Sequence, residues 1–199
     1  MSSRSLIRFS LGAALVCASS VVGAMPVISQ DQPLFDPNNA IASFGNEPAQ
    51  SFRQTIGDNI RGAGVLLLGQ GATGDVTISL YANSLPTQSS GAPLRTGTVT
   101  GVHGGFYADV LWDRLDSKPD VLYFLVFTAS NNTGLQIAGL GGNPYEFGDL
   151  YLMGEQKEGL DTTFRTYYDD ARTVPEPGTL ALLGLAAAGL AFTRRRCNS

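Results

Sequence analysis

The chain has 199 residues, of which 43% are hydrophobic, 9% aromatic and 15% charged, with 24 glycines and 10 prolines. This composition is typical of a turn-rich β protein, and it excludes a collagen-like chain, a coiled coil and a polar disordered chain. Residues 25–174 carry 8 basic and 16 acidic side chains, a net charge of −8, which argues against nucleic acid as a partner and against binding to anionic lipid.

Residues 1–24 have the features of a secretory signal peptide. Arg4 and Arg8 form a positive first region, an apolar stretch runs from Leu11 to Val16, and small residues lead up to Ala24. We therefore expect export by the general secretion machinery, with signal peptidase cutting after Ala24. The alternative, an uncleaved membrane anchor, is disfavoured because the apolar stretch is short for a membrane span.

The expected strands follow a looser, proline-rich lead-in over residues 25–50. Val76, Ile78 and Leu80 alternate with more polar residues, which is the clearest strand pattern in the chain. Residues 121–127 are apolar on both faces and predict a buried central strand. Further strands are predicted at 52–56, 64–69, 96–100, 106–112, 135–137, 150–152 and 164–168.

Clusters of glycine, proline, asparagine and aspartate separate these segments, as in proteins built from short antiparallel strands. The pattern predicts an all-β domain over residues 51–168, an antiparallel β-sandwich of about nine strands that is jelly-roll-like. A linker over residues 169–173 follows. Cys17 and Cys197 both lie outside this domain, so packing without disulfides must stabilise it.

Residues 174–199 form a second terminal signal. It consists of a proline motif, an uncharged apolar run and a basic cluster: Val174-Pro175-Glu176-Pro177, residues 178–193 and Arg194-Arg195-Arg196. As a helix the apolar run would be about 24 Å long, somewhat short for a hydrocarbon core of about 30 Å. We expect a transmembrane helix whose arginines stay on the cytoplasmic side of the inner membrane, with the body outside.

This tail resembles the PEP-CTERM sorting signal of Gram-negative bacteria through Pro175, Glu176, Pro177, the apolar helix and the terminal arginines. The resemblance implies recognition by exosortase, a membrane transpeptidase-like protease that would cut near the Pro-Glu-Pro motif. The body would then pass to the cell surface or extracellular matrix, in a setting that contains exopolysaccharide. The alternative is an ordinary single-span anchor with a chance Pro-Glu-Pro sequence.

The body is similar to a β-sandwich domain that recurs in bacterial surface proteins, over residues 50–168. The similarity lies in Asp75–Tyr81, Asn143–Tyr145, Gly148–Tyr151 and Asp161–Tyr167. It implies a fold and a surface setting, and it supplies no catalytic residues.

Candidate catalytic groups are few. The single histidine, His103, lies among glycines and cannot form a multi-histidine metal site. Four aspartates in or after one expected strand offer carboxylates for a glycosidase or for Ca²⁺: Asp109, Asp113, Asp116 and Asp120. Their spacing matches neither use, so a solvated acidic face is expected. We expect no catalytic residue, metal ligand or cofactor, with bound calcium as the remaining alternative.

Aromatic side chains offer a third kind of site, because sugar rings stack on flat aromatic faces. Most aromatic residues in strands belong to the core or to cross-strand pairs. Tyr145 and Phe147 lie in a loop rich in glycine and proline, so they are expected to be an exposed pair with ligand stacking as their role.

Together these features predict an exported, exosortase-sorted protein of the cell surface or extracellular matrix. It would be non-catalytic, and either structural or associated with polysaccharide. The alternative from a different class is a secreted carbohydrate-active enzyme, a glycosidase that uses the loop carboxylates.

Overall fold

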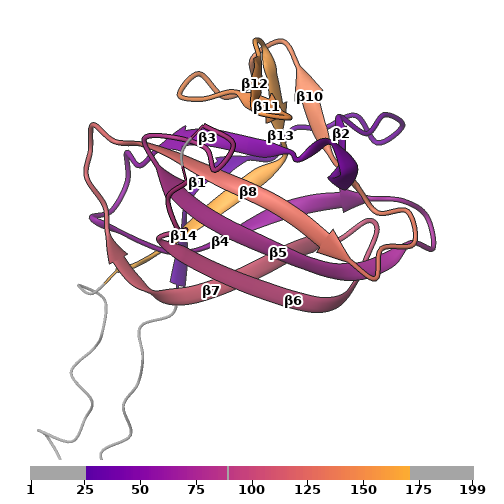
Figure 1. Cartoon of the computed structure of the whole chain (residues 1–199), viewed down its shortest axis with the longest axis horizontal. Coiled ribbons are helices and arrows are strands. Elements are labelled where there is room, and N and C mark those ends of the chain that lie inside the picture. The colour runs from indigo at the N-terminus through magenta and orange to yellow at the C-terminus, as the bar shows by residue number, and fades with distance from the viewer. Residues whose placement is uncertain (1–25, 89, 171–199) are drawn as a thin grey trace, which may run out of the picture.

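The structure is a computed structural model that describes residues 26–88 and 90–170 (Figure 1). Within these residues the chain forms fourteen strands and one short 3₁₀ helix, so the expected all-β class is confirmed. The strands are β1 (Pro26–Gln32), β2 (Ala42–Ser43), β3 (Ala49–Arg53), β4 (Asn59–Leu68), β5 (Thr73–Ala82), β6 (Arg95–His103), β7 (Tyr107–Asp116), β8 (Leu122–Ser130), β9 (Gln136–Ile137), β10 (Gly139–Gly141), β11 (Leu150–Leu152), β12 (Glu155–Lys157), β13 (Leu160–Thr162) and β14 (Phe164–Asp169), and the helix is η1 (Phe44–Asn46).

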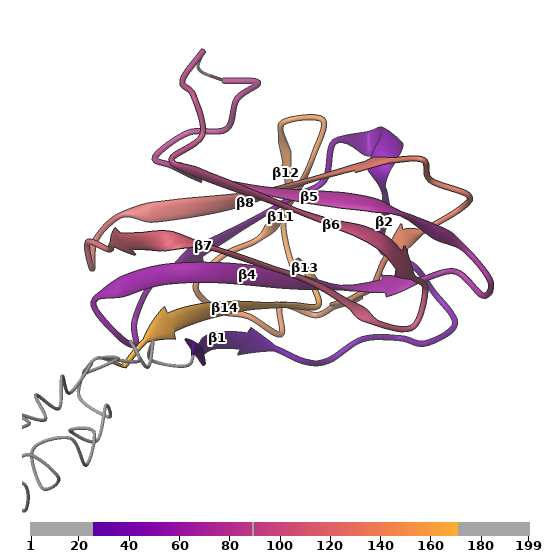
Figure 2. The same ribbon diagram turned by 90° about the horizontal axis from the view of Figure 1, so that it is seen from below.

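Two antiparallel sheets face each other across the core (Figure 2). The first sheet runs β1-β14-β4-β7, and β9 and β2 extend it beyond the end of β4. The second sheet runs β12-β11-β3-β8-β5-β6. A small pair, β10 and β13, joins the loops at one end of the molecule (Figure 1). The expected antiparallel sandwich is therefore present.

The order of the longer strands is that of a jelly roll. Counted along the chain, the eight longer strands are β1, β3, β4, β5, β6, β7, β8 and β14. One sheet holds the first, eighth, third and sixth of them, and the other holds the second, seventh, fourth and fifth. This wrapping of paired strands across two sheets is the jelly-roll topology, so the jelly-roll expectation is also confirmed.

The core lies between the two sheets, and its main cluster of buried side chains is apolar. Strand β8 pairs with β3 on one side and β5 on the other, as expected for a central strand. Its Tyr123, Leu125 and Phe127 point into the main core, while Phe124 packs on the opposite face. The fully buried large apolar side chains of the core include Phe52, Ile60, Leu67, Ile78, Leu80, Leu125, Phe127, Leu135, Ile137, Leu150 and Phe164.

The chain crosses from the second sheet to the first where β6 leads into β7, because β6 pairs with β5 and β7 pairs with β4. A Cβ at Gly97 would lie 2.8 Å from the Val110 Cβ, so glycine lets β6 approach β7 closely. The Arg95 Nε donates to the Asp113 carbonyl oxygen at 2.9 Å and ties the two strands together. Strands β6 and β7 thus close one side of the sandwich.

Two sequence-based expectations need correction. About nine strands were expected, and each overlaps an observed strand, although the one expected at 52–56 ends at Arg53. Strands β1, β2, β10, β12 and β13 were missed. Except for β1, the missed strands have only two or three residues, which is too short to show an alternating pattern. Strand β1 also shows that residues 25–50 are not merely a lead-in, because it pairs with β14 along the edge of the first sheet. The expected signal helix and transmembrane helix lie outside the described residues.

Candidate functional site

The described chain begins and ends at one corner of the body, which we call the exit corner and define by Pro26, Ile56, Asn59 and Asp169. Pro26 pairs with Asp169 in the β1–β14 ladder. Figure 1 shows the ends of β1 and β14 side by side. The expected sorting residues are outside the described part of the chain: Ala24, Val174, Pro175, Glu176, Pro177, Arg194, Arg195 and Arg196.

The expected stacking pair is corrected at Tyr145. This side chain is only 6% exposed, and its ring meets Phe164 edge-on with centroids 5.1 Å apart. The hydroxyl donates to the Gln30 Oε1 or to the Arg53 carbonyl oxygen, both at 3.3 Å, and burial raises the Tyr145 pKa to about 12. Phe147 is 49% exposed, so only one ring of the expected pair faces solvent.

A buried carboxylate holds the loop that carries Tyr145. The Asp161 Oδ2 accepts from the Tyr145 backbone N–H at 3.1 Å, and its Oδ1 accepts from the Gln50 Nε2 at 2.8 Å. Burial raises the pKa of Asp161, while both hydrogen bonds lower it. Tyr145 and Asp161 therefore serve the packing of this loop.

The aspartates expected as an acidic cluster are spread along β7 and its following loop. Asp109 binds the Arg165 guanidinium and accepts from the Tyr167 hydroxyl at 2.8 Å. Asp113, Asp116 and Asp120 are all exposed, and Asp116 accepts from the Arg114 Nε at 3.0 Å. Within residues 26–88 and 90–170, no group of three or more His, Cys, Asp or Glu side chains is placed to hold a metal ion.

His103 ends strand β6 and is exposed. It lies opposite Thr73 in the β5–β6 ladder. The structure thus places it at a strand end beside the glycine turn rather than inside a site.

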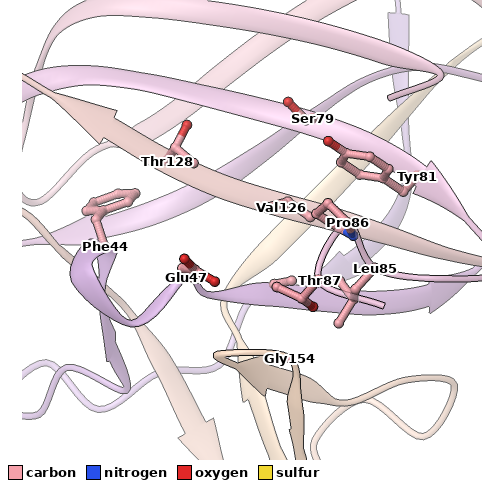
Figure 3. A pocket seen from close by; sticks show the side chains of 11 residues that line it. Phe44, Glu47, Ser79, Tyr81, Leu85, Pro86, Thr87, Val126, Thr128 and Gly154 are labelled. Atoms are coloured by element: carbon pink, nitrogen blue, oxygen red, sulfur yellow. The ribbon is translucent and has the colours of Figure 1, made fainter. Parts of the chain in front are cut away.

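The outer face of the second sheet carries a groove that the sequence did not predict (Figure 3). The groove encloses about 370 Å³. Its floor is formed by outward-facing residues of two adjacent strands, Ser79 and Tyr81 on β5 and Val126 and Thr128 on β8.

Three segments far apart in the sequence form the walls of this groove. Phe44 and Glu47 stand on one side, and the loop after β5 stands on the other with Leu85, Pro86 and Thr87. Gly154, in the turn between β11 and β12, closes the lower rim. No local pattern links residues 44–47, 85–87 and 154, which is why sequence inspection missed the groove.

Hydroxyl groups continue from the groove floor across the sheet. The Ser79 Oγ and Thr96 Oγ1 are 3.1 Å apart, and the Thr77 Oγ1 and Thr98 Oγ1 are 2.7 Å apart. Thr128 is the partner of Thr77 on the other side, in the β5–β8 ladder. The Tyr81 ring and these serine and threonine hydroxyl groups therefore lie on the same outer face of the second sheet. The exposed Glu47 carboxylate lies at the side of this face.

The fold and this groove define a jelly-roll β-sandwich protein with an open, partly polar groove on one sheet. The comparisons then add its sorting class: residues 173–196 match the family described as "PEP-CTERM protein-sorting motif". The chain carries this motif, which marks it as an exported protein sorted by exosortase. Comparisons with curated proteins and with solved structures gave no match.

The membrane-spanning part of the sorting signal is a prediction from sequence. In the part of the chain that the structure describes, no helix is long and apolar enough to cross a membrane. The expected span over residues 178–193 lies outside that part.

Proposed function

We propose that this protein is a non-catalytic protein of the cell surface or extracellular matrix, and that its body associates with extracellular polysaccharide through the groove on the second sheet. In this proposal the C-terminal helix holds the chain in the inner membrane until exosortase cuts near Pro175, Glu176 and Pro177. The body then carries the groove to the outside.

The observation that carries the polysaccharide proposal is the combination of groups in the groove. Tyr81 offers an aromatic ring beside apolar carbons of Val126, and a sugar ring has apolar C–H faces that suit such a surface. Ser79, Thr128 and Glu47 add hydroxyl and carboxylate oxygens that can bond to sugar hydroxyls.

The charge of the body narrows the choice of glycan. Residues 25–174 carry a net charge of −8, and Glu47 adds a negative charge at the groove itself. Like charges repel at the approach to a site and in contact. A neutral polysaccharide is therefore favoured over an acidic one.

Binding of the mature exported protein to immobilised glycans tests this proposal. Neutral glucans, mannans and galactans are compared with an acidic glycan such as alginate. Wild type should bind at least one neutral glycan, and Tyr81→Ala should weaken that binding by about tenfold or more. Phe147→Ala and Phe106→Ala are matched controls, since both remove an exposed aromatic ring away from the groove, and they should bind as wild type does.

Two results would contradict the proposal. Failure of wild type to bind any neutral glycan, or loss of binding in Phe147→Ala with none in Tyr81→Ala, would reject the groove as the site. Release of sugar fragments from the bound glycan, abolished by Asp113→Asn or Asp116→Asn, would favour the glycosidase alternative instead.

A further inference from the structure

The groove on the second sheet lies across three neighbouring strands. Ala49 of β3, Val126 of β8 and Ser79 of β5 all line it. In the sheet order these strands lie between β11 on one side and β6 on the other. A chain that follows the groove across the strands therefore points toward the β11–β12 hairpin at one end and toward β6 at the other.

The end of the groove at the hairpin is closed by the turn that contains Gly154 (Figure 3). A Cβ at Gly154 would lie 2.7 Å from the Thr87 Oγ1, and the Gln88 Nε2 donates to the Gly154 carbonyl oxygen at 3.4 Å. The turn therefore packs against the wall formed by the loop after β5. The Met153 N–H donates to the Asn46 carbonyl oxygen at 2.8 Å, which ties the turn to the segment of the opposite wall. The two walls and the turn thus enclose the groove on three sides.

The end of the groove at β6 leads onto hydroxyl groups. The Ser79 Oγ lies 3.1 Å from the Thr96 Oγ1, and the Thr77 Oγ1 lies 2.7 Å from the Thr98 Oγ1. Thr96 and Thr98 are exposed residues of β6, the last strand of this sheet. A chain that leaves the groove across β6 therefore still meets hydrogen-bond donors and acceptors.

We propose that the groove recognises an end of a neutral polysaccharide chain, and that Thr96 and Thr98 bind the sugars that follow the first ones. This inference rests on the proposed binding of neutral polysaccharide in the groove. An internal stretch of chain would have to pass through the turn at Gly154. A chain end beside Val126 and Tyr81 instead leaves the rest of the chain to cross β5 and β6.

Competition with soluble glycans tests the recognition of a chain end. Binding of the mature exported protein to immobilised glucan, mannan or galactan is competed with linear hexasaccharides of the same sugar and linkage, and with the long parent polymers. The molar concentration of chains that halves binding should agree within about twofold for hexasaccharide and polymer, because each chain offers one such end. Recognition of internal stretches would make each polymer chain more potent in proportion to its length, and that result would overturn the proposal.

Variants of β6 test the path that the chain takes out of the groove. The double variant Thr96→Val, Thr98→Val keeps the β-branched shape that suits a strand and removes both hydroxyl groups. It should bind the hexasaccharide about fivefold or more weakly. Thr100→Val is the matched control, since Thr100 is exposed on the same strand two residues further from the groove, and it should bind as wild type does.

A disaccharide serves as the control for the fold of the double variant. The three strands of the groove floor span about 10 Å, enough for two sugar units that do not reach β6. The double variant should therefore bind the disaccharide as wild type does, which also shows that its groove is intact. Equal weakening of disaccharide and hexasaccharide would reject a separate contact on β6.

The outcomes separate this inference from the proposed function. If wild type binds no neutral glycan, or if Tyr81→Ala binds as wild type does, the proposed function fails. If Tyr81→Ala weakens binding and the potency of each chain rises with its length, the proposed function stands and the recognition of a chain end is wrong. If the double variant binds the hexasaccharide as wild type does, or if Thr100→Val weakens it equally, the path across Thr96 and Thr98 is wrong.

Discussion

Asp109 and Arg165 belong to strands that are not neighbours, and they meet above the strand between them. Arg165 of β14 and Asp109 of β7 are both ladder partners of Gly64 on β4. The Arg165 Nε donates to the Asp109 Oδ1 at 2.9 Å, and the guanidinium lies 3.9 Å from the centre of the Tyr107 ring. The missing side chain at Gly64 makes this contact across three strands sterically feasible.

Gly64→Ala should lower the free energy of unfolding by about 1–3 kcal/mol, because the new Cβ would overlap the Asp109 carboxylate and force the pair apart. Urea unfolding of the mature exported protein measures this. Gly45→Ala is the matched control, since the nearest atom to its added Cβ would be 4.0 Å away. Equal effects of the two substitutions would show that the Asp109–Arg165 contact does not depend on Gly64.

Leu125→Ala should lower the free energy of unfolding by about 2–5 kcal/mol, because Leu125 is fully buried at the centre of β8 and its removal leaves a cavity. Leu111→Ala removes the same atoms from a side chain that is 55% exposed, and it should cost well under 1 kcal/mol, as is usual at the surface. A loss below about 1 kcal/mol for Leu125→Ala would contradict its central place in the core.

Asp161→Asn should lower the free energy of unfolding by about 1–3 kcal/mol at neutral pH. Both carboxylate oxygens accept hydrogen bonds, from Tyr145 and Gln50, and an amide offers only one acceptor. Asp113→Asn is the matched control, because Asp113 is exposed, and it should change the free energy of unfolding by less than about 0.5 kcal/mol.

The pH dependence of the Asp161→Asn effect follows from the raised pKa of Asp161. The folded protein holds the proton more tightly than the unfolded chain, whose reference pKa is 3.8. The stabilisation that this tighter proton binding gives the folded protein is complete below the unfolded pKa of 3.8. It is lost as pH rises through the higher pKa of Asp161 in the folded protein. The stability difference between wild type and Asp161→Asn should thus narrow from pH 3.5 to pH 7, and a difference that widens would contradict this.

Replacement of Arg194, Arg195 and Arg196 by glutamine should weaken retention of the unprocessed chain in the inner membrane. Positive residues hold the cytoplasmic end of a membrane helix in place, and the expected helix is short. Fractionation of cells that lack exosortase measures the amount of full-length chain in membranes. A change of the same arginines to lysine should preserve retention, and unchanged retention in the glutamine variant would argue against their anchoring role.

Strong local patterns predicted the fold well. The alternation of Val76, Ile78 and Leu80 appears as the inward face of β5, and the apolar segment at 121–127 is the central strand β8. Strand β1 was missed because its inward side chains are polar. Ser29, Gln30 and Gln32 are buried through hydrogen bonds to distant groups, such as the Gln54 Nε2 on Ser29, and such partners leave no hydrophobic pattern.

The candidate sites were harder to predict, because they depend on contacts between distant segments. Tyr145 lies in a loop whose composition indicates exposure, yet Phe164 and Gln30 cover it. The outward position of Tyr81 follows from the alternation in β5, but the walls around it come from loops with no shared signal. The terminal sorting signal was predictable because it is defined by consecutive residues, so its recognition in the sequence needs no contacts between distant segments.

Sorting by exosortase is tested by the intact mass of the protein recovered from outside cells that contain exosortase. The mature species should begin after Ala24 and end near Pro175–Pro177, without the apolar segment and the terminal arginines. A mature species that still ends at Ser199 in that host would contradict it.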